Sequence, residues 1–230
     1  MTHTSGLPPY APVSELQEKY GSPNPKGLME YISTCKRESK PQTKFQYSCL
    51  NYITLQHIIE TITGQSLRDF AKENIFDILG MQYTDYLPTI QQQDGKWINT
   101  VACPWMDRIA PTEKQKDGSV LCGQVHDPLA RILNGGISGN AGIFSNANDI
   151  GILAAALLNG GEYNGHRILS PLGVKTMCTV PRELTAFGRT PGWDIFSPYA
   201  SNKGDLFSPN TFGHTCLLYT SPSPRDPKTS

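Results

Sequence analysis

The sequence predicts a mixed α and β fold, and three patterns along the chain support this. Apolar residues recur at near-helical spacing over residues 50–63, and Gly64 supplies a helix stop. Ser66 opens a capping-box pattern, so a second helix is expected to run from there toward Gly80. Beyond Phe187, a mixture of aromatic residues with glycine and proline favours strands and hairpin turns.

The remaining segments are expected to be shorter or irregular. The first forty-odd residues resemble extended loop with a short helix over 26–34, and residues 82–124 should form loops and short strands. Four glycines make a turn-dense loop of residues 134–142. Ser145 is expected to cap the next helix, and Pro171 to occupy the first position of another.

Composition excludes several classes of function. Twenty basic residues balance twenty acidic ones, and no basic stripe interleaved with aromatic residues is present, so a nucleic-acid partner is not expected. No apolar run reaches the roughly 18 to 20 residues of a membrane-spanning helix. The six cysteines form no C-x-x-C pair and no Cys/His cluster at metal spacing, so free buried thiols are expected rather than a zinc site.

Five short motifs follow one another along the chain. They are Tyr47-Ser48-Cys49, Gly64-Gln65-Ser66, His126-Asp127, Gly135-Gly136 with residues 141–145, and Phe212-Gly213-His214-Thr215. Their order resembles that of the serine β-lactamase and penicillin-binding-protein superfamily, in the branch of class C β-lactamases, D-alanyl-D-alanine peptidases and esterases. The opening residues 2–7 resemble the segment that follows the nucleophile helix in that branch.

The resemblance implies a fold class and a set of boundaries. It implies an α/β (α+β) fold of the β-lactamase/transpeptidase-like type, with a helical subdomain and an antiparallel sheet that is incomplete here. Residues 1–215 would form a partial β-lactamase-related serine hydrolase domain. Residues 216–230 resemble a translated sequencing adapter, because the family has glycine directly after Thr215, and a natural Pro/Ser-rich tail is the alternative.

The resemblance also assigns candidate site residues. Tyr47 matches the tyrosine of a Y-x-N motif and would act as a base if positive charge lowered its pKa from about 10. Cys49 stands where the motif has asparagine and is the candidate contact to the substrate carbonyl, although a thiol is a weaker hydrogen-bonding group than an amide. His214 and Thr215 match the third motif; His214 replaces its lysine and would be catalytic, and Thr215 would bind the substrate.

Other polar residues are expected to be structural. Asn140 is interpreted as part of the loop architecture, and His126-Asp127 as a capping or turn pair. Ser33 and Lys36 give the one S-x-x-K match, but about one match is expected by chance at this composition, and its position in the motif order is wrong. The nucleophile motif is therefore expected upstream of residue 1, which makes the chain an interior fragment.

The resulting hypothesis is part of a serine acyl hydrolase that acts on a peptide, ester or β-lactam carbonyl through an acyl-enzyme. Its partner would be a small-molecule or peptide acyl substrate, and the resemblance implies no metal and no organic cofactor. The chain as given would be inactive. A non-catalytic cell-wall or ligand-binding module of the same fold is the main alternative, and a plain helical structural domain is another. Localisation stays open, with export or a periplasmic location among the options for the parent protein.

Overall fold

The computed structural model describes residues 1–115, 117–195, 208 and 211–214. The chain divides into two compact units. The larger contains His3–Pro171, and the smaller contains Met1–Thr2 together with the segment from Leu172 onward. Helices and short antiparallel sheets occur together, which confirms the predicted mixed fold.

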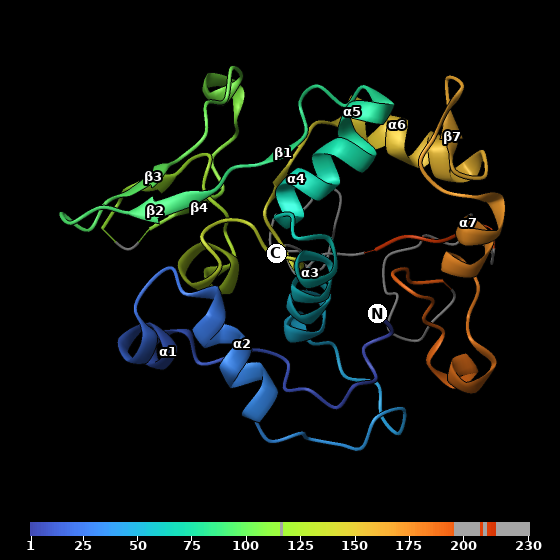
Figure 1. Ribbon diagram of the computed structural model, residues 1–230, viewed down its shortest axis with the longest axis horizontal. Helices are drawn as coiled ribbons and strands as arrows, with labels where there is room; N and C mark the ends of the chain where they lie inside the picture. Colours follow the sequence, from blue (N-terminus) through green and yellow to red (C-terminus); the bar gives the residue numbers. More distant parts are fainter. Residues whose placement is uncertain (116, 196–207, 209–210, 215–230) are drawn as a thin grey trace, which may run out of the picture. The chain divides into compact units, whose positions relative to one another are not determined.

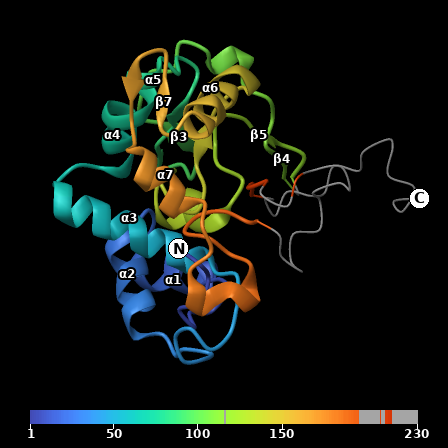
Figure 2. The same ribbon diagram turned by 90° about the vertical axis from the view of Figure 1, so that its right-hand side faces the viewer.

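The larger unit is mainly helical (Figure 1). Figures 1 and 2 both place α1 and α2 beside one end of α3, and α4, α5 and α6 toward its other end. In chain order its helical elements are α1 (Val13–Tyr20), α2 (Pro25–Thr34), α3 (Cys49–Thr63), α4 (Leu67–Ala71), the π-helical η1 (Lys72–Phe76), α5 (Asp77–Leu79), the 3₁₀ turn η2 (Met106–Arg108), the π-helical η3 (Leu129–Leu133) and α6 (Ala147–Leu158).

The strands of this unit form four antiparallel pairs of two strands each. The pairs are β1 (Asp85–Tyr86) with β6 (Ile143–Phe144), β2 (Thr89–Gln91) with β3 (Trp97–Asn99), β4 (Glu113–Lys114) with β5 (Val120–Leu121), and β7 (Glu162–Tyr163) with β8 (His166–Arg167). The β1–β6 pair joins segments far apart in the sequence, whereas the other three pairs are local hairpins.

Local sequence signals explain the ends of the central helices. Helix α3 ends at Gly64, whose φ of 70° is left-handed and therefore suits glycine. The Ser66 side chain accepts a hydrogen bond from the Asp69 N–H and begins α4, as the capping pattern predicts. The run toward Gly80 is continuous, although its middle turn is π-helical.

Helix α6 begins one residue later than predicted. Its N-cap is Asn146, whose side chain accepts from the Asp149 N–H, so the prediction of Ser145 as the cap is wrong. Asparagine caps helices at least as well as serine, and the two residues are adjacent. The Ser145 hydroxyl instead lies 2.7 Å from the Thr84 hydroxyl, and it thereby links α6 to the segment before β1.

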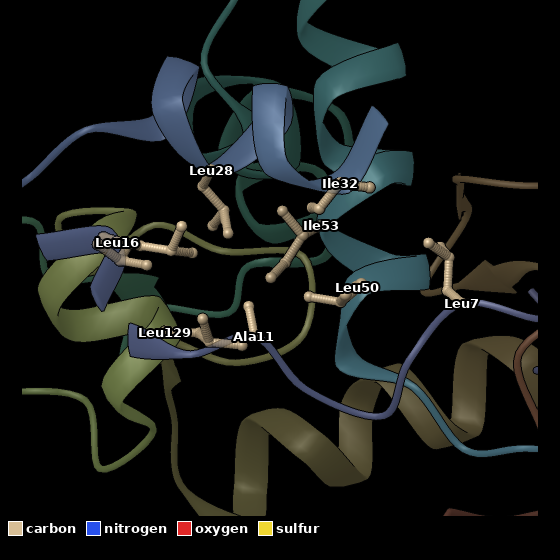
Figure 3. Packing of buried hydrophobic residues seen from close by; sticks show 9 residues of the cluster. Leu7, Ala11, Leu16, Leu28, Ile32, Leu50, Ile53 and Leu129 are labelled. Atoms are coloured by element: carbon tan, nitrogen blue, oxygen red, sulfur yellow. The ribbon is translucent and has the colours of Figure 1, made fainter. Parts of the chain in front are cut away.

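Two clusters of buried apolar residues hold the larger unit together. The first joins α1, α2, the start of α3, η3 and the N-terminal segment; Figure 3 shows Leu28 and Ile32 of α2 directed toward Ile53 of α3. The second joins α4, η1, α5 and α6 around Phe76 and Ala156. Removing one such buried leucine side chain typically costs about 2 to 5 kcal/mol of stability.

The smaller unit contains a short helix and two isolated β-bridges. It comprises most of α7 (Pro171–Met177), which begins at proline as predicted, and the 3₁₀ turn η4 (Arg182–Phe187). Asp194 bridges both Arg189 and Gly213 in antiparallel fashion, in line with the expected hairpin-like pairing beyond Phe187. Residues 215–230, with the predicted tail, lie outside the described residues.

The cysteines among the described residues are free, as expected, but they are less buried than expected. Five of the six cysteines are described, namely Cys35, Cys49, Cys103, Cys122 and Cys178, and Cys216 lies outside the described residues. None of these five is fully buried, and Cys122 is exposed, because each lies at the edge of a helix or in a loop rather than in either apolar cluster's centre.

Candidate active site

Tyr47 lies two residues before helix α3, next to its N-cap Ser48, and 38% of its surface is exposed. Its ring stacks on the imidazole of His3, with the ring centroids 4.2 Å apart and the planes inclined by 26°. Offset stacking of this kind restricts an aromatic side chain. Tyr47 is therefore both accessible to a substrate and held on one face.

The two residues after Tyr47 are hydrogen-bonded to the N-terminal segment. The Ser48 N–H donates to His3 Nδ1 at 3.1 Å, and the Ser48 hydroxyl donates to the Pro8 carbonyl at 2.5 Å. The Cys49 N–H donates to the Pro9 carbonyl at 3.0 Å. The first N–H groups of a helix have no partner within the helix, so these bonds satisfy groups that would otherwise be left open.

Cys49 is the first residue of α3 and is half-buried. Its side chain packs against the first apolar cluster. This environment suits a small apolar group and gives a thiol little opportunity to orient a substrate carbonyl. A substrate contact by Cys49 stays a prediction.

The glycine-rich loop of residues 134–142 is fastened to α3 by one side chain. Gln56 Oε1 accepts from the Gly139 N–H at 3.0 Å and from Asn134 Nδ2 at 3.2 Å, and Gln56 Nε2 donates to the Ile137 carbonyl at 3.1 Å. A Cβ at Gly139 would lie 2.0 Å from the Tyr52 carbonyl oxygen, so only glycine fits. The loop consequently lies against the first two turns of α3.

The polar residues interpreted as structural are structural. Asn140 Oδ1 accepts from the Ser138 hydroxyl inside the loop at 2.7 Å. Asp127 Oδ1 accepts from the Ala130 N–H at 2.9 Å, and its other oxygen accepts from the Tyr10 hydroxyl at 3.1 Å. Burial, and then the Asp127 charge, raise the pKa of Tyr10. Asp127 therefore binds an N–H in the first turn of η3, in line with the capping or turn role that the sequence predicts.

His214 lies beside a buried ion pair in the smaller unit. Gly213 exchanges backbone hydrogen bonds with Asp194 at 2.7 and 2.9 Å, and Asp194 Oδ2 lies 3.1 Å from Arg189 Nη1. Part of the His214 side chain is exposed. Desolvation of the imidazole, and then the positive charge of Arg189, lower its pKa, whereas the negative charge of Asp194 raises it. Thr215, the other candidate in this motif, lies outside the described residues.

The S-x-x-K match is on the surface of α2. The Ser33 hydroxyl donates to the Glu30 carbonyl at 2.8 Å and is exposed. Hydroxyl groups of serine in helices commonly make this local bond to the preceding turn. Ser33 therefore makes a local helix contact, as a chance S-x-x-K match would.

Among the described residues, no group of three or more His, Cys, Asp or Glu side chains is placed to hold a metal ion. Within that same part of the chain, no helix has the length and apolar character needed to cross a membrane.

The structure brings together only part of the predicted site. Tyr47 and Cys49 belong to the larger unit and His214 to the smaller, so their convergence on one substrate stays a prediction. The sequence analysis missed two residues with structural roles, namely His3 beside Tyr47 and Gln56 beside the glycine-rich loop. His3 could have been found, because it lies in the opening segment that resembles the family. Gln56 belongs to no motif, so no sequence signal pointed to it.

A family model described as Beta-lactamase matches residues 1–222. The chain belongs to the β-lactamase family. A relative in Escherichia coli (strain K12), named "Putative D-alanyl-D-alanine carboxypeptidase", is 32% identical over 229 residues, which cover 93% of this chain and 50% of that protein. The chain thus spans about half the length of the curated relatives it matches.

Solved structures support the fold of this β-lactamase family chain. The penicillin-binding protein homologue from Pyrococcus abyssi matches with a TM-score of 0.52 and 20% identity, over 85% of this chain and 42% of that one. A D-stereospecific amidohydrolase from Streptomyces sp. matches with a TM-score of 0.54 and 18% identity, over 85% of this chain and 56% of that one. The predicted resemblance and fold class are confirmed.

Proposed function

We propose that this chain is part of a serine acyl hydrolase that forms an acyl-enzyme on a peptide, ester or β-lactam carbonyl. A peptide with D-amino acids at its end is the favoured substrate, because relatives about 32% identical to this chain are named "Putative D-alanyl-D-alanine carboxypeptidase". The observation that carries the proposal is Tyr47, which is accessible at a helix start and held there by the N-terminal segment.

In the proposed reaction, Tyr47 moves the proton. The ionised phenol oxygen takes the proton of a serine hydroxyl while the serine oxygen bonds to the carbonyl carbon. Tyr47 then gives this proton to the leaving amine as the carbon–nitrogen bond breaks, and water hydrolyses the ester. A phenol with an ordinary pKa of about 10 needs a neighbouring cation for this role, which the lysine of S-x-x-K would supply. His214 and Thr215 would bind the substrate carboxylate.

We further propose that the nucleophile is not among these 230 residues. The one S-x-x-K match places its serine on α2 with the hydroxyl donated to a backbone carbonyl. Without an activated serine there is no acyl-enzyme, and catalytic sites that lose their nucleophile retain only about 10³- to 10⁴-fold acceleration over water, which itself needs an intact oxyanion hole.

The first experiment uses the chain as given. It is incubated with a chromogenic β-lactam, a short-chain nitrophenyl ester and a fluorophosphonate probe, and no turnover and no covalent labelling are expected. The control is Ser33→Ala. Stoichiometric labelling that this substitution abolishes would show that Ser33 is the nucleophile, and the proposal of an absent nucleophile would be wrong.

The second experiment uses a longer protein that includes the upstream segment. There, Tyr47→Phe should lower kcat by roughly 10²- to 10⁴-fold, the usual contribution of a general acid–base group. Tyr83→Phe is the matched control, since Tyr83 has a similar exposure of 37% in the same unit. Equal effects of the two substitutions would contradict a proton-transfer role for Tyr47.

A non-catalytic cell-wall or ligand-binding module is the second candidate. It is favoured by Cys49, whose thiol replaces the motif amide and packs against the apolar cluster. The residue at the serine position of the upstream motif discriminates the two functions. If that position holds a residue without a nucleophilic group, the binding module is correct and the hydrolase is not.

A further inference from the structure

We infer that His3 is a positioning residue for Tyr47: its neutral imidazole sets the orientation of the tyrosine ring. His3 also binds the N–H of Ser48, the residue after Tyr47, from 45 positions upstream in the sequence. This inference deepens the proposed function and rests on it for its catalytic meaning. The contacts that carry it lie entirely within the larger unit.

The backbone of His3 adopts a conformation that side chains other than glycine rarely take. Its φ is 56°, in the left-handed region, and its side chain is only 2% exposed. Histidine, asparagine and aspartate tolerate this region better than other residues, yet it remains unfavourable for each of them. A strained residue persists where surrounding contacts over-determine it, and such residues cluster at functional sites.

The imidazole nitrogen Nδ1 is held as an acceptor. It receives the Ser48 N–H at 3.1 Å, and Asn51 Nδ2 lies 3.3 Å from it. Because a backbone N–H can only donate, Nδ1 must be unprotonated, and the ring proton of the neutral imidazole is therefore on Nε2. Ser48 is fully buried, so loss of this acceptor would leave its N–H without a partner away from water.

Aromatic rings surround the imidazole. Tyr47 stacks on it at 4.2 Å, Tyr52 lies at 5.3 Å in a tilted arrangement, and Phe45 lies edge-on at 6.2 Å. Tyr47 is the most exposed of these three rings, and the buried imidazole of His3 stacks on one of its faces.

The backbone on both sides of Tyr47 is attached to the same segment. The Gln46 N–H donates to the His3 carbonyl at 2.9 Å, and the Ser48 N–H donates to the His3 side chain. His3 thus contacts the residue before Tyr47, the residue after it, and the Tyr47 ring itself. A residue that merely filled the core would not require bonds to both neighbours of one exposed tyrosine.

Two substitutions separate the two contacts. His3→Asn tolerates the left-handed backbone and keeps an acceptor oxygen close to the position of Nδ1, but it removes the stacking ring. His3→Phe keeps a ring and removes the acceptor. His57→Asn is the matched control, because His57 is an exposed histidine on α3 of the same unit.

The readout is the side-chain rotamer ratio of Tyr47, measured by three-bond NMR couplings in the full chain, with Tyr47→Phe to assign the signals. In His3→Asn the ratio of the main to the minor rotamer should fall roughly two- to tenfold, the range expected for loss of one aromatic pair. His3→Phe should keep the ratio and increase hydrogen exchange at the Ser48 amide. His57→Asn should change neither.

A wild-type measurement covers the case in which a variant does not fold. The ¹⁵N shifts of the His3 ring should identify Nδ1 as unprotonated and Nε2 as carrying the proton. A protonated Nδ1, or a Tyr47 rotamer ratio in folded His3→Asn equal to that in His57→Asn, would overturn the inference. None of these readouts needs turnover, so failure of the proposed acyl transfer would be seen separately in the longer protein.

Discussion

Gln56→Ala tests whether one side chain fastens the glycine-rich loop to helix α3. Gln56 is 6% exposed and makes four hydrogen bonds, to the Gly139 N–H at 3.0 Å, Asn134 Nδ2 at 3.2 Å, the Ile137 carbonyl at 3.1 Å and Glu60 Oε1 at 3.1 Å. Alanine removes all four bonds while keeping a good helix former.

The size of the effect depends on which partners are left unsatisfied. Asn134 Nδ2 keeps its bond to the Ser138 hydroxyl at 2.8 Å, and Glu60 Oε1 keeps the Leu67 N–H at 3.0 Å. The two loop backbone groups lose their partner, and each such loss costs about 1 to 3 kcal/mol when buried. Both belong to half-buried residues, so we expect a total of about 2 to 4 kcal/mol, or roughly a 30- to 700-fold lower folding equilibrium constant.

The assay is urea unfolding together with hydrogen exchange at the Gly139 amide. Gln82→Ala is the control, because Gln82 is exposed in the same unit and should change stability by no more than about 0.5 kcal/mol. The reasoning is refuted if Gln56→Ala matches this control, or if the Gly139 amide stays as protected as in the wild type.

Three further predictions concern the loop and the smaller unit. Gly139→Ala should cost about 1 to 3 kcal/mol in urea unfolding, because its Cβ would lie 2.0 Å from a carbonyl oxygen of α3, whereas Gly151→Ala in α6 meets nothing within 4 Å and should be neutral or stabilising. Asp194→Ala leaves the buried guanidinium of Arg189 without its carboxylate and should destabilise the smaller unit by about 3 to 5 kcal/mol in thermal unfolding; a loss below about 1 kcal/mol would contradict the pairing. Arg189→Met should raise the pKa of His214 in an NMR titration, since Arg189 lowers it after burial does. Because the folded pKa of His214 lies below its unfolded value of 6.5, the unfolded chain binds more protons in that window, so His214 should destabilise the fold as pH falls below 6.5.

The sequence predicted those elements whose signals are local. Helix α3, its glycine stop and the Ser66 cap follow from residues within a few positions of each other, and the structure confirms them. Helix α1 was missed because it is only eight residues long and begins after Pro12 without a side-chain cap, so it lacks the start signal that marks the other helices. Its helical state comes from packing against the first apolar cluster.

In the candidate site too, the sequence predicted the local features and missed the contacts between distant segments. The position of Tyr47 at a helix start follows from the motif and the helix pattern, both of which are local. The contacts of His3 and Gln56 join segments far apart in the sequence, and no spacing rule relates a histidine to an N–H that lies 45 residues later. A resemblance to a family supplies motif positions, but it does not supply such pairings.

The attachment of Ser48 and Cys49 to the N-terminal segment has a consequence for folding order. Helix α3 can form from its own residues, whereas the acceptors at His3, Pro8 and Pro9 arrive only after a loop of about forty residues has closed, which adds an entropic barrier. The orientation of Tyr47 should therefore be among the last features to form and the first to be lost. The orientation of Tyr47 can therefore be lost while the circular dichroism spectrum still reports an intact helix α3.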